Sequence, residues 1–261
     1  MLKRFTNDFL VDDLQLLPPN HILLTLKLMD GILPEILPGQ FVEIKIPDTA
    51  NTFLRRPISI HDVNFENQTI TLLIRVVGNG TTKLSLLNKG ESVNLVYPLG
   101  NGFDLFKVGQ KPLLIGGGVG VAPLLYLGRC LKKSNIEVNY LLGVKSISDL
   151  LCYNAYSSIG SVNITTEDGT AGTKGFVTNH DLLNVDNVHQ FTSLLVCGPT
   201  PMMKAVANVA KSANVPCFVS LENKMACGIG VCLCCVTDTK DGHKCVCSDG
   251  PIFDINDLKW E

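Results

Sequence analysis

Short apolar runs separated by turn signals dominate the first hundred residues. Runs rich in Leu, Ile and Val occupy residues 21–28, 41–46, 69–77 and 92–97, and segments containing Pro, Gly and Asn lie between them. Such segments favour turns, and the runs have the length and composition of β-strands. Short strands at this spacing are typical of a small antiparallel barrel. We therefore expect a β-barrel domain over residues 1–105.

From about residue 106 the pattern becomes one of strands alternating with helices. The predicted strands are residues 111–117, 136–143, 161–166, 191–198 and 216–221. Residues 122–133 and 200–213 have the spacing of amphipathic helices, and another helix is expected from Ser148. This alternation predicts an α/β domain with a parallel sheet over residues 106–221. Residues 222–261 show little periodicity, so we expect a third small domain in which a metal replaces a core.

Composition narrows the functional classes. Of the 261 residues, 46% are hydrophobic and 18% are charged, and the net charge is −2. The low charged fraction fits a large core or a subunit interface, and without a basic stripe we expect no nucleic-acid partner. No run is long enough to span a bilayer, and the N-terminal stretch lacks the apolar region of a secretory signal. We expect a cytoplasmic protein that does not bind a membrane.

Six of the ten cysteines lie within 21 residues, which favours a metal site over a disulfide scaffold. The candidate ligands are Cys227, Cys232, Cys235 and Cys247. The spacing C-x4-C-x2-C followed by a distant cysteine is that of plant-type [2Fe–2S] ligands. The alternative is a structural zinc site, which usually pairs two shorter knuckles. Choosing Cys234 or Cys245 instead would break the x2 spacing or shorten the final gap.

A glycine-rich turn follows the first strand of the predicted α/β domain. Gly117, Gly118 and Gly120 lie where backbone amides can meet a pyrophosphate at a helix N-terminus. The next predicted strand ends without the acidic residue that normally holds a ribose, so a purely structural turn stays an alternative. Cys197 and Gly198 repeat the turn after a later strand. Cys197 is either a small buried residue or a nicotinamide contact.

A third group of candidate residues lies in the barrel half. The residues are Arg56, Pro57, Ile58, Ser59, Leu73, Ile74, Arg75, Gly80 and Thr81. Two arginines, hydroxyl groups and a glycine turn can bind a diphosphate, although arginines on strands are often simply solvated. The five histidines form no ligand-spaced pair and no nucleophile elbow is present, so we assign no catalytic amino acid.

Taken in order, these motifs resemble the ferredoxin-NADP reductase superfamily. The cysteine segment is similar to that of the iron–sulfur electron-transfer subunits of type B dihydroorotate dehydrogenases. The resemblance implies FAD on the barrel, NAD on the α/β domain and a [2Fe–2S] cluster on the four cysteines. It places residues 56–59 and 73–75 along the flavin, with Gly80 and Thr81 at its pyrophosphate.

The resemblance also implies a function and a partner. Electrons would pass from the FMN of a dihydroorotate dehydrogenase catalytic subunit through the cluster and FAD to NAD⁺, in pyrimidine (UMP) biosynthesis. The expected assembly is a heterotetramer with two copies of each subunit. Apolar residues at 230–236 and 250–255 would form its interface, unless they pack inward. The alternatives are a reductase subunit of a glutamate synthase-like or hydrogenase-linked complex, and a zinc-stabilised nucleotide-binding regulator.

Overall fold

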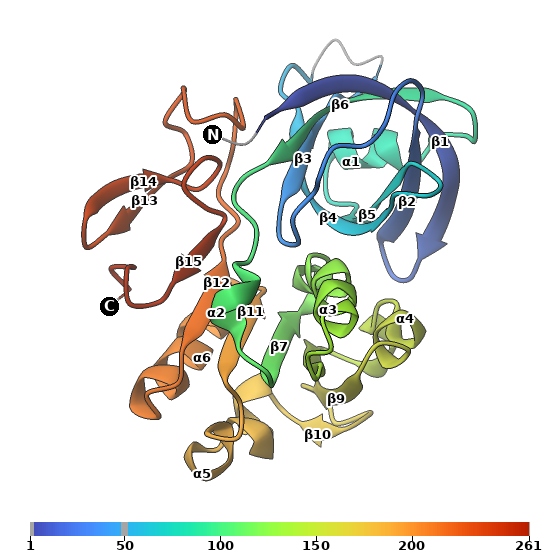
Figure 1. The fold of residues 1–261 in the computed structure, drawn as a ribbon. Coiled ribbons are helices and arrows are strands. Elements are labelled where there is room, and N and C mark those ends of the chain that lie inside the picture. The colour runs from blue at the N-terminus through green and yellow to red at the C-terminus, as the bar shows by residue number, and fades with distance from the viewer. Residues whose placement is uncertain (1–2, 48–51, 261) are drawn as a thin grey trace. The chain divides into compact units, whose positions relative to one another are not determined.

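The computed structural model describes residues 3–47 and 52–260, which form two compact units (Figure 1). Unit 1 comprises Met1–Gly102, Glu222–Thr237 and His243–Pro251. Unit 2 comprises Phe103–Leu221, Asp238–Gly242 and Ile252–Glu261. The segment from residue 222 is thus divided between both units instead of forming a compact unit of its own. The three segments 1–105, 106–221 and 222–261 stay a prediction about functional domains.

Unit 1 is built on the closed antiparallel barrel that the sequence predicts, with strand order β1-β2-β5-β4-β3-β6. The elements are β1 (Phe5–Leu17), β2 (His21–Leu28), β3 (Phe41–Ile44), β4 (Arg56–Asn64), β5 (Thr69–Arg75), α1 (Asn79–Leu84) and β6 (Ser92–Leu99). Alternating apolar residues fill the barrel. Leu24 is paired with Leu72 and Leu26 with Ile70, and all four side chains are fully buried. Burial of this apolar surface is the main force that closes the barrel.

Unit 2 contains a seven-stranded sheet with the order β10-β9-β8-β7-β11-β12-β15. The strands are β7 (Pro112–Gly117), β8 (Asn139–Val144), β9 (Ser161–Thr166), β10 (Thr173–Lys174), β11 (Ser193–Cys197), β12 (Cys217–Ser220) and β15 (Ile252–Asp254). All neighbours are parallel except β15, which pairs antiparallel with β12. The parallel α/β prediction is confirmed. Because β7 and β11 are neighbours, their following turns meet at one edge of the sheet.

The helices of unit 2 are α2 (Leu105–Val108), α3 (Leu124–Lys133), α4 (Tyr153–Ser157), α5 (Val185–Val188) and α6 (Thr200–Ser212). The helix expected from Ser148 is wrong in its start, because a 3-10 turn over Ile147–Asp149 precedes α4. A two-stranded sheet of β13 (Val236–Thr239) and β14 (Gly242–Cys245) follows the cysteine triplet. Within residues 3–47 and 52–260, the structure has no helix both long and apolar enough to cross a membrane.

Candidate iron–sulfur, flavin and nucleotide sites

The cysteine loop of unit 1 wraps tightly, and its backbone amides point at the thiols. Gly228, Gly230 and Leu233 have φ of 65°, 85° and 59°, a left-handed conformation that favours glycine. The N–H of Gly230 donates to Cys247 Sγ at 3.1 Å, and that of Ile229 donates to Cys227 Sγ at 3.4 Å. Hydrogen bonds to sulfur are what tune an iron–sulfur centre. The loop therefore folds so that its backbone amides surround the thiol groups and can stabilise thiolates.

The four candidate ligands lie in two linked pairs. The N–H of Cys232 donates to Cys227 Sγ at 3.5 Å, and the N–H of Cys247 donates to Cys235 Sγ at 3.4 Å. Among the described residues, no three His, Cys, Asp or Glu side chains are grouped so as to hold one metal ion. Two thiol pairs suit a two-iron cluster, in which each iron takes two protein ligands, better than a single zinc ion.

The electrostatics of the pairs differ. Burial would raise the pKa of Cys227, but hydrogen bonds from the amides of Ile229 and Cys232 outweigh burial and lower this pKa to about 6. Burial and the neighbouring Cys235 raise the pKa of Cys247 to about 12. Metal binds the thiolate, so cluster assembly has to release the Cys247 proton.

Two further cysteines lie next to the candidate ligands. Cys234 is exposed, and Cys245 is buried beside Cys235. The Cys245 amide donates to Asp249 at 2.7 Å, which orients the chain before Cys247. Cys245 therefore lies beside the buried thiol of Cys235, although its position in the sequence does not fit the ligand spacing.

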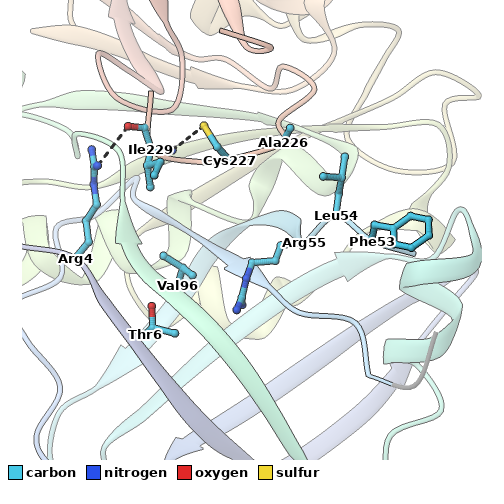
Figure 2. Close-up of a pocket in the computed structure, with 9 residues that line it drawn as sticks. All are labelled: Arg4, Thr6, Phe53, Leu54, Arg55, Val96, Ala226, Cys227 and Ile229. Carbon is cyan, nitrogen blue, oxygen red and sulfur yellow. Dashed lines mark hydrogen bonds between the residues drawn. The ribbon is translucent and has the colours of Figure 1, made fainter. Parts of the chain in front are cut away.

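A cavity of about 560 Å³ opens in unit 1 beside Cys227 (Figure 2). Its lining residues are Arg4, Thr6, Phe53, Leu54, Arg55, Val96, Ala226, Cys227 and Ile229. Arg4 Nη1 donates to the Ile229 carbonyl at 3.3 Å, and Arg55 Nη1 donates to the backbone carbonyls of Glu43 and Asn94. The cavity is therefore cationic with apolar walls, and a cluster ligand forms part of its surface.

The expected flavin residues are brought together at α1. A Cβ added to Gly80 would lie 3.1 Å from Arg56 Nε, so the glycine leaves room for the guanidinium. Thr81 Oγ1 accepts from the amides of Val77 and Gly78 and donates to the Gly78 carbonyl. Thr81 thus shapes the turn with its side chain, and the arginine remains the charged group available to a diphosphate.

The remaining flavin candidates are less exposed than expected of ligand contacts. Leu73 and Ile74 are 2% and 1% exposed, whereas Arg75 at the end of β5 is exposed. Pro57, Ile58 and Ser59 on β4 are half-buried and pair with β3. Residues 57–59 and 73–75 lie on β4 and β5, which are neighbouring strands of the barrel, and this placement fits a flavin lying along them.

The glycine turns of unit 2 have two distinct roles. A Cβ on Gly120 would lie 2.6 Å from Gly198 Cα, and a Cβ on Gly117 would lie 2.5 Å from Met202 Sδ. These three glycines allow the β7 and β11 turns to pack. Gly118, by contrast, has φ of 55° and open space where a Cβ would be. Gly118 is therefore the position at which a ligand phosphate can approach the backbone.

The helix expected directly after that turn is displaced. A 3-10 segment over Gly118–Val121 comes first, and Pro123 then caps α3. Cys197 is fully buried in β11, which agrees with the small buried residue that the sequence allows.

Sequence reasoning missed two groups. The first joins the ends of β8 and β9: Thr170 Oγ1 accepts from the Ile147 amide at 2.9 Å, and Asp168 holds Thr170 through its amide and hydroxyl. These hydrogen bonds with Thr170 lower the pKa of Asp168. No motif near the end of β8 indicates this carboxylate, because Asp168 follows the next strand, β9.

The second missed group is Glu43 on β3. It is 1% exposed, and burial raises its pKa to about 7, with Arg55 opposing the rise and Cys227 adding to it. The apolar run around it hides this residue in the sequence.

Comparison with known proteins identifies the domains and the family of this chain. Residues 222–259 match the family described as the iron–sulfur cluster binding domain of dihydroorotate dehydrogenase B, and residues 114–208 match the oxidoreductase NAD-binding domain. A relative from Bacillus pumilus, named "Dihydroorotate dehydrogenase B (NAD(+)), electron transfer subunit", is 41% identical over 225 residues, covering 84% of this chain and 85% of the relative. A relative of the same name from Fusobacterium nucleatum is 38% identical, covering 86% and 87%.

Solved structures extend the similarity to the fold. The NADH-dependent reduced ferredoxin-NADP oxidoreductase, determined in a study of flavin-based electron bifurcation, superposes with a TM-score of 0.84 and 28% identity. The match covers 97% of this chain and 90% of that chain. The FAD/NAD-binding domain of a Vibrio cholerae nitric oxide dioxygenase, at 20% identity and a TM-score of 0.68, shares the fold over 80% of this chain and 94% of its own.

These matches confirm the expected domain types and the cofactor set of FAD, a [2Fe–2S] cluster and NAD. The thiol pairs, the arginine beside Gly80 and the open turn at Gly118 fit that set. The chain belongs to the family of electron transfer subunits of dihydroorotate dehydrogenase B (NAD(+)).

Proposed function

We propose that this chain carries electrons from the FMN of a dihydroorotate dehydrogenase catalytic subunit, through its [2Fe–2S] cluster and FAD, to NAD⁺ in pyrimidine (UMP) biosynthesis. The observation that carries the proposal is the amide–thiol network around two cysteine pairs, in a chain that also has the barrel and the nucleotide domain. The proposed compartment is the cytoplasm, where thiols stay reduced.

The chemistry balances without a catalytic amino acid in this chain. Dihydroorotate loses two electrons and two protons to become orotate, while NAD⁺ takes up two electrons and one proton, so one proton is released. When bound, NAD⁺ accepts hydride and the cluster carries one electron at a time, and FAD, which handles both modes, has to lie between them. The protein's own task is to bind, orient and insulate these groups.

We assign the cluster ligands from the pairs described above. Cys227 and Cys232 would hold one iron, and Cys235 and Cys247 would hold the other. Amides of the loop would donate hydrogen bonds to the sulfurs, stabilising their negative charge. Arg56 beside Gly80 would bind the flavin diphosphate, and the turn at Gly118 would bind the nucleotide pyrophosphate.

The docking face for the catalytic subunit is proposed at the cysteine loop and the neighbouring cavity. Val231 and Leu233 are 75% and 64% exposed, and Phe53 at the cavity rim is 91% exposed. Exposed apolar residues close to a redox centre fit a permanent interface. Phe253 and Ile255 are instead buried with β15, so the second apolar stretch packs inward.

The purified subunit provides the test. We expect a visible spectrum with flavin and iron–sulfur bands, FAD on chemical analysis, and NADH-dependent reduction of artificial acceptors. Dihydroorotate-dependent NAD⁺ reduction should be absent until the catalytic subunit is added, and light scattering should then show two copies of each subunit. A colourless zinc protein, or dihydroorotate oxidation by this chain in isolation, would refute the assignment.

A further inference from the structure

Glu43 is a buried acid that the electron-transfer scheme does not use. It lies on β3 between Val42 and Ile44, which are both fully buried. Neither carboxyl oxygen has a hydrogen-bond partner within the described part of the chain. A buried polar group without a partner costs free energy, so its presence calls for a group that the folded chain alone does not supply.

The carboxyl group lies directly against the cysteine loop. A Cβ added to Gly228, the residue after Cys227, would be 2.7 Å from Glu43 Cγ and 3.1 Å from Glu43 Oε1. Gly228 therefore has to be glycine partly because Glu43 occupies the adjoining space. Glu43 and the loop belong to the same compact unit, so this contact is part of the folding of unit 1.

Among the described residues, no cation is hydrogen-bonded to the carboxyl group. Arg55, the cation with the largest effect on this carboxyl group, donates to the main-chain carbonyls of Glu43 and Asn94 and to the Asn94 amide oxygen, not to the Glu43 carboxylate. An iron–sulfur cluster held by four thiolates would be negatively charged in both redox states, so a hydrogen-bond donor beside it would stabilise that charge. A protonated carboxyl group is a hydrogen-bond donor, and sulfur is the acceptor that an assembled cluster brings to this loop.

We propose that Glu43 is a positioning residue for the iron–sulfur centre: its buried carboxyl group supports the loop at Gly228 and donates a hydrogen bond toward the sulfur atoms. Such a bond stabilises the more negative, reduced cluster and so raises its reduction potential. Through Glu43, the barrel that binds the flavin would also adjust the reduction potential of the cluster, which donates electrons to that flavin. The inference rests on the ligand assignment proposed above.

The experiment compares Glu43→Gln with Glu43→Leu in the full-length chain. Glutamine keeps the size and a donor, whereas leucine keeps only the approximate size. Iron and acid-labile sulfide content, the cluster's electron paramagnetic resonance spectrum and its midpoint potential are measured for each. We expect Glu43→Gln to match the wild type. In Glu43→Leu the ratio of reduced to oxidised cluster at a fixed NADH:NAD⁺ ratio should fall about threefold or more, because the lost hydrogen bond is stronger to the reduced cluster than to the oxidised one.

Val42→Ala is the matched control, because alternation along the strand places this buried side chain on the other face of β3. It should lower stability without moving the potential. If Glu43→Leu does not fold, Glu43→Met, with a flexible chain of similar length, gives the same readout. A wild-type potential in the leucine or methionine variant, or an equal shift in Glu43→Gln, overturns the inference. A wild-type protein without a [2Fe–2S] cluster would instead overturn the proposed function.

Discussion

The four proposed ligands differ in how exposed their side chains are to solvent. Cys232 is exposed, whereas Cys235 and Cys247 are 2% and 0% exposed. The exposed member is open to solvent and to a partner, while the buried pair anchors the loop to the rest of unit 1. Both pairs are nevertheless required, because an iron that loses a thiolate loses half of its protein ligands.

Serine replacement of any one of the four should abolish or destabilise the cluster, because a hydroxyl is a poor ligand for iron–sulfide chemistry. Iron content and the visible spectrum of the purified variants measure this. Cys234→Ser and Cys245→Ser are the matched controls and should keep the cluster. Loss of iron in Cys245→Ser together with retention in Cys235→Ser would reassign the buried pair.

Arg56→Ala should release FAD. Its guanidinium lies beside Gly80, and a charge-assisted contact to phosphate contributes roughly 1.5–3 kcal/mol, which corresponds to about 10- to 140-fold in affinity. Flavin content after gel filtration and titration of the apoprotein with FAD both report it. Lys27→Ala, which removes an exposed cation from β2, should leave FAD bound. Normal flavin retention in Arg56→Ala would count against the site.

Asp168 offers a test of nucleotide preference. Its carboxylate stands where β9 ends beside the end of β8, the region in which related folds distinguish a ribose hydroxyl from a 2′-phosphate. Asp168→Asn should raise the kcat/KM ratio of NADPH to NADH about tenfold, since a like charge near the phosphate is removed. Glu167→Gln, the neighbouring exposed acid, is the control and should leave the ratio unchanged.

At the scale of elements, regular strands follow from the sequence and irregular ones do not. The predicted bounds of β2 and β9 are confirmed residue by residue, because β-branched residues and leucines run between clear turn signals. The pattern does not mark β1, whose acidic residues at 12 and 13 lie at a register shift against β2. It also does not place β15, which joins the sheet by pairing with a strand distant in sequence.

The site residues likewise divide into those that the local sequence predicts and those that it does not. Local spacing predicts the cysteines and the glycine turns. Glu43 and Asp168 become visible only when separate segments meet, since their neighbours are Gly228 and the end of β8. Their chemistry arises from tertiary structure, which no local motif records.

The short segment around His180 gives unit 2 a pH dependence. His180 Nδ1 accepts the Leu182 amide at 3.2 Å, and burial lowers the pKa of this histidine. The unfolded chain therefore binds the proton more readily, so this contribution to stability is present above the ordinary histidine pKa and is lost as the pH falls below it. His180→Asn keeps a capping acceptor and should reduce the loss of unfolding free energy between pH 7.5 and 5.5, measured by urea denaturation. An identical pH profile would contradict this role.

At the scale of the whole molecule, the exposed apolar residues of the cysteine loop predict where the catalytic subunit binds. Replacing Val231 and Leu233 together by Asp should weaken binding to the catalytic subunit about 30-fold or more, as expected for central interface residues. The subunit's own NADH:acceptor activity should persist. Leu86→Asp removes another exposed apolar side chain of unit 1, outside the cavity lining, and should not change binding. Unaltered affinity of the double variant, measured by calorimetry, would move the interface elsewhere.

The division of the C-terminal segment between two units has a consequence for how the protein is made. Residues 222–237 and 243–251 complete unit 1, yet the ribosome synthesises them only after most of unit 2. Unit 1 is therefore incomplete, without its cysteine loop, while the chain from β7 to β12 is synthesised and folds. Cluster insertion is for this reason a late step, and the iron–sulfur segment is not a module that can be moved to another reductase by cutting at residue 222. An exchange that preserves both units would have to graft β15 together with the loop.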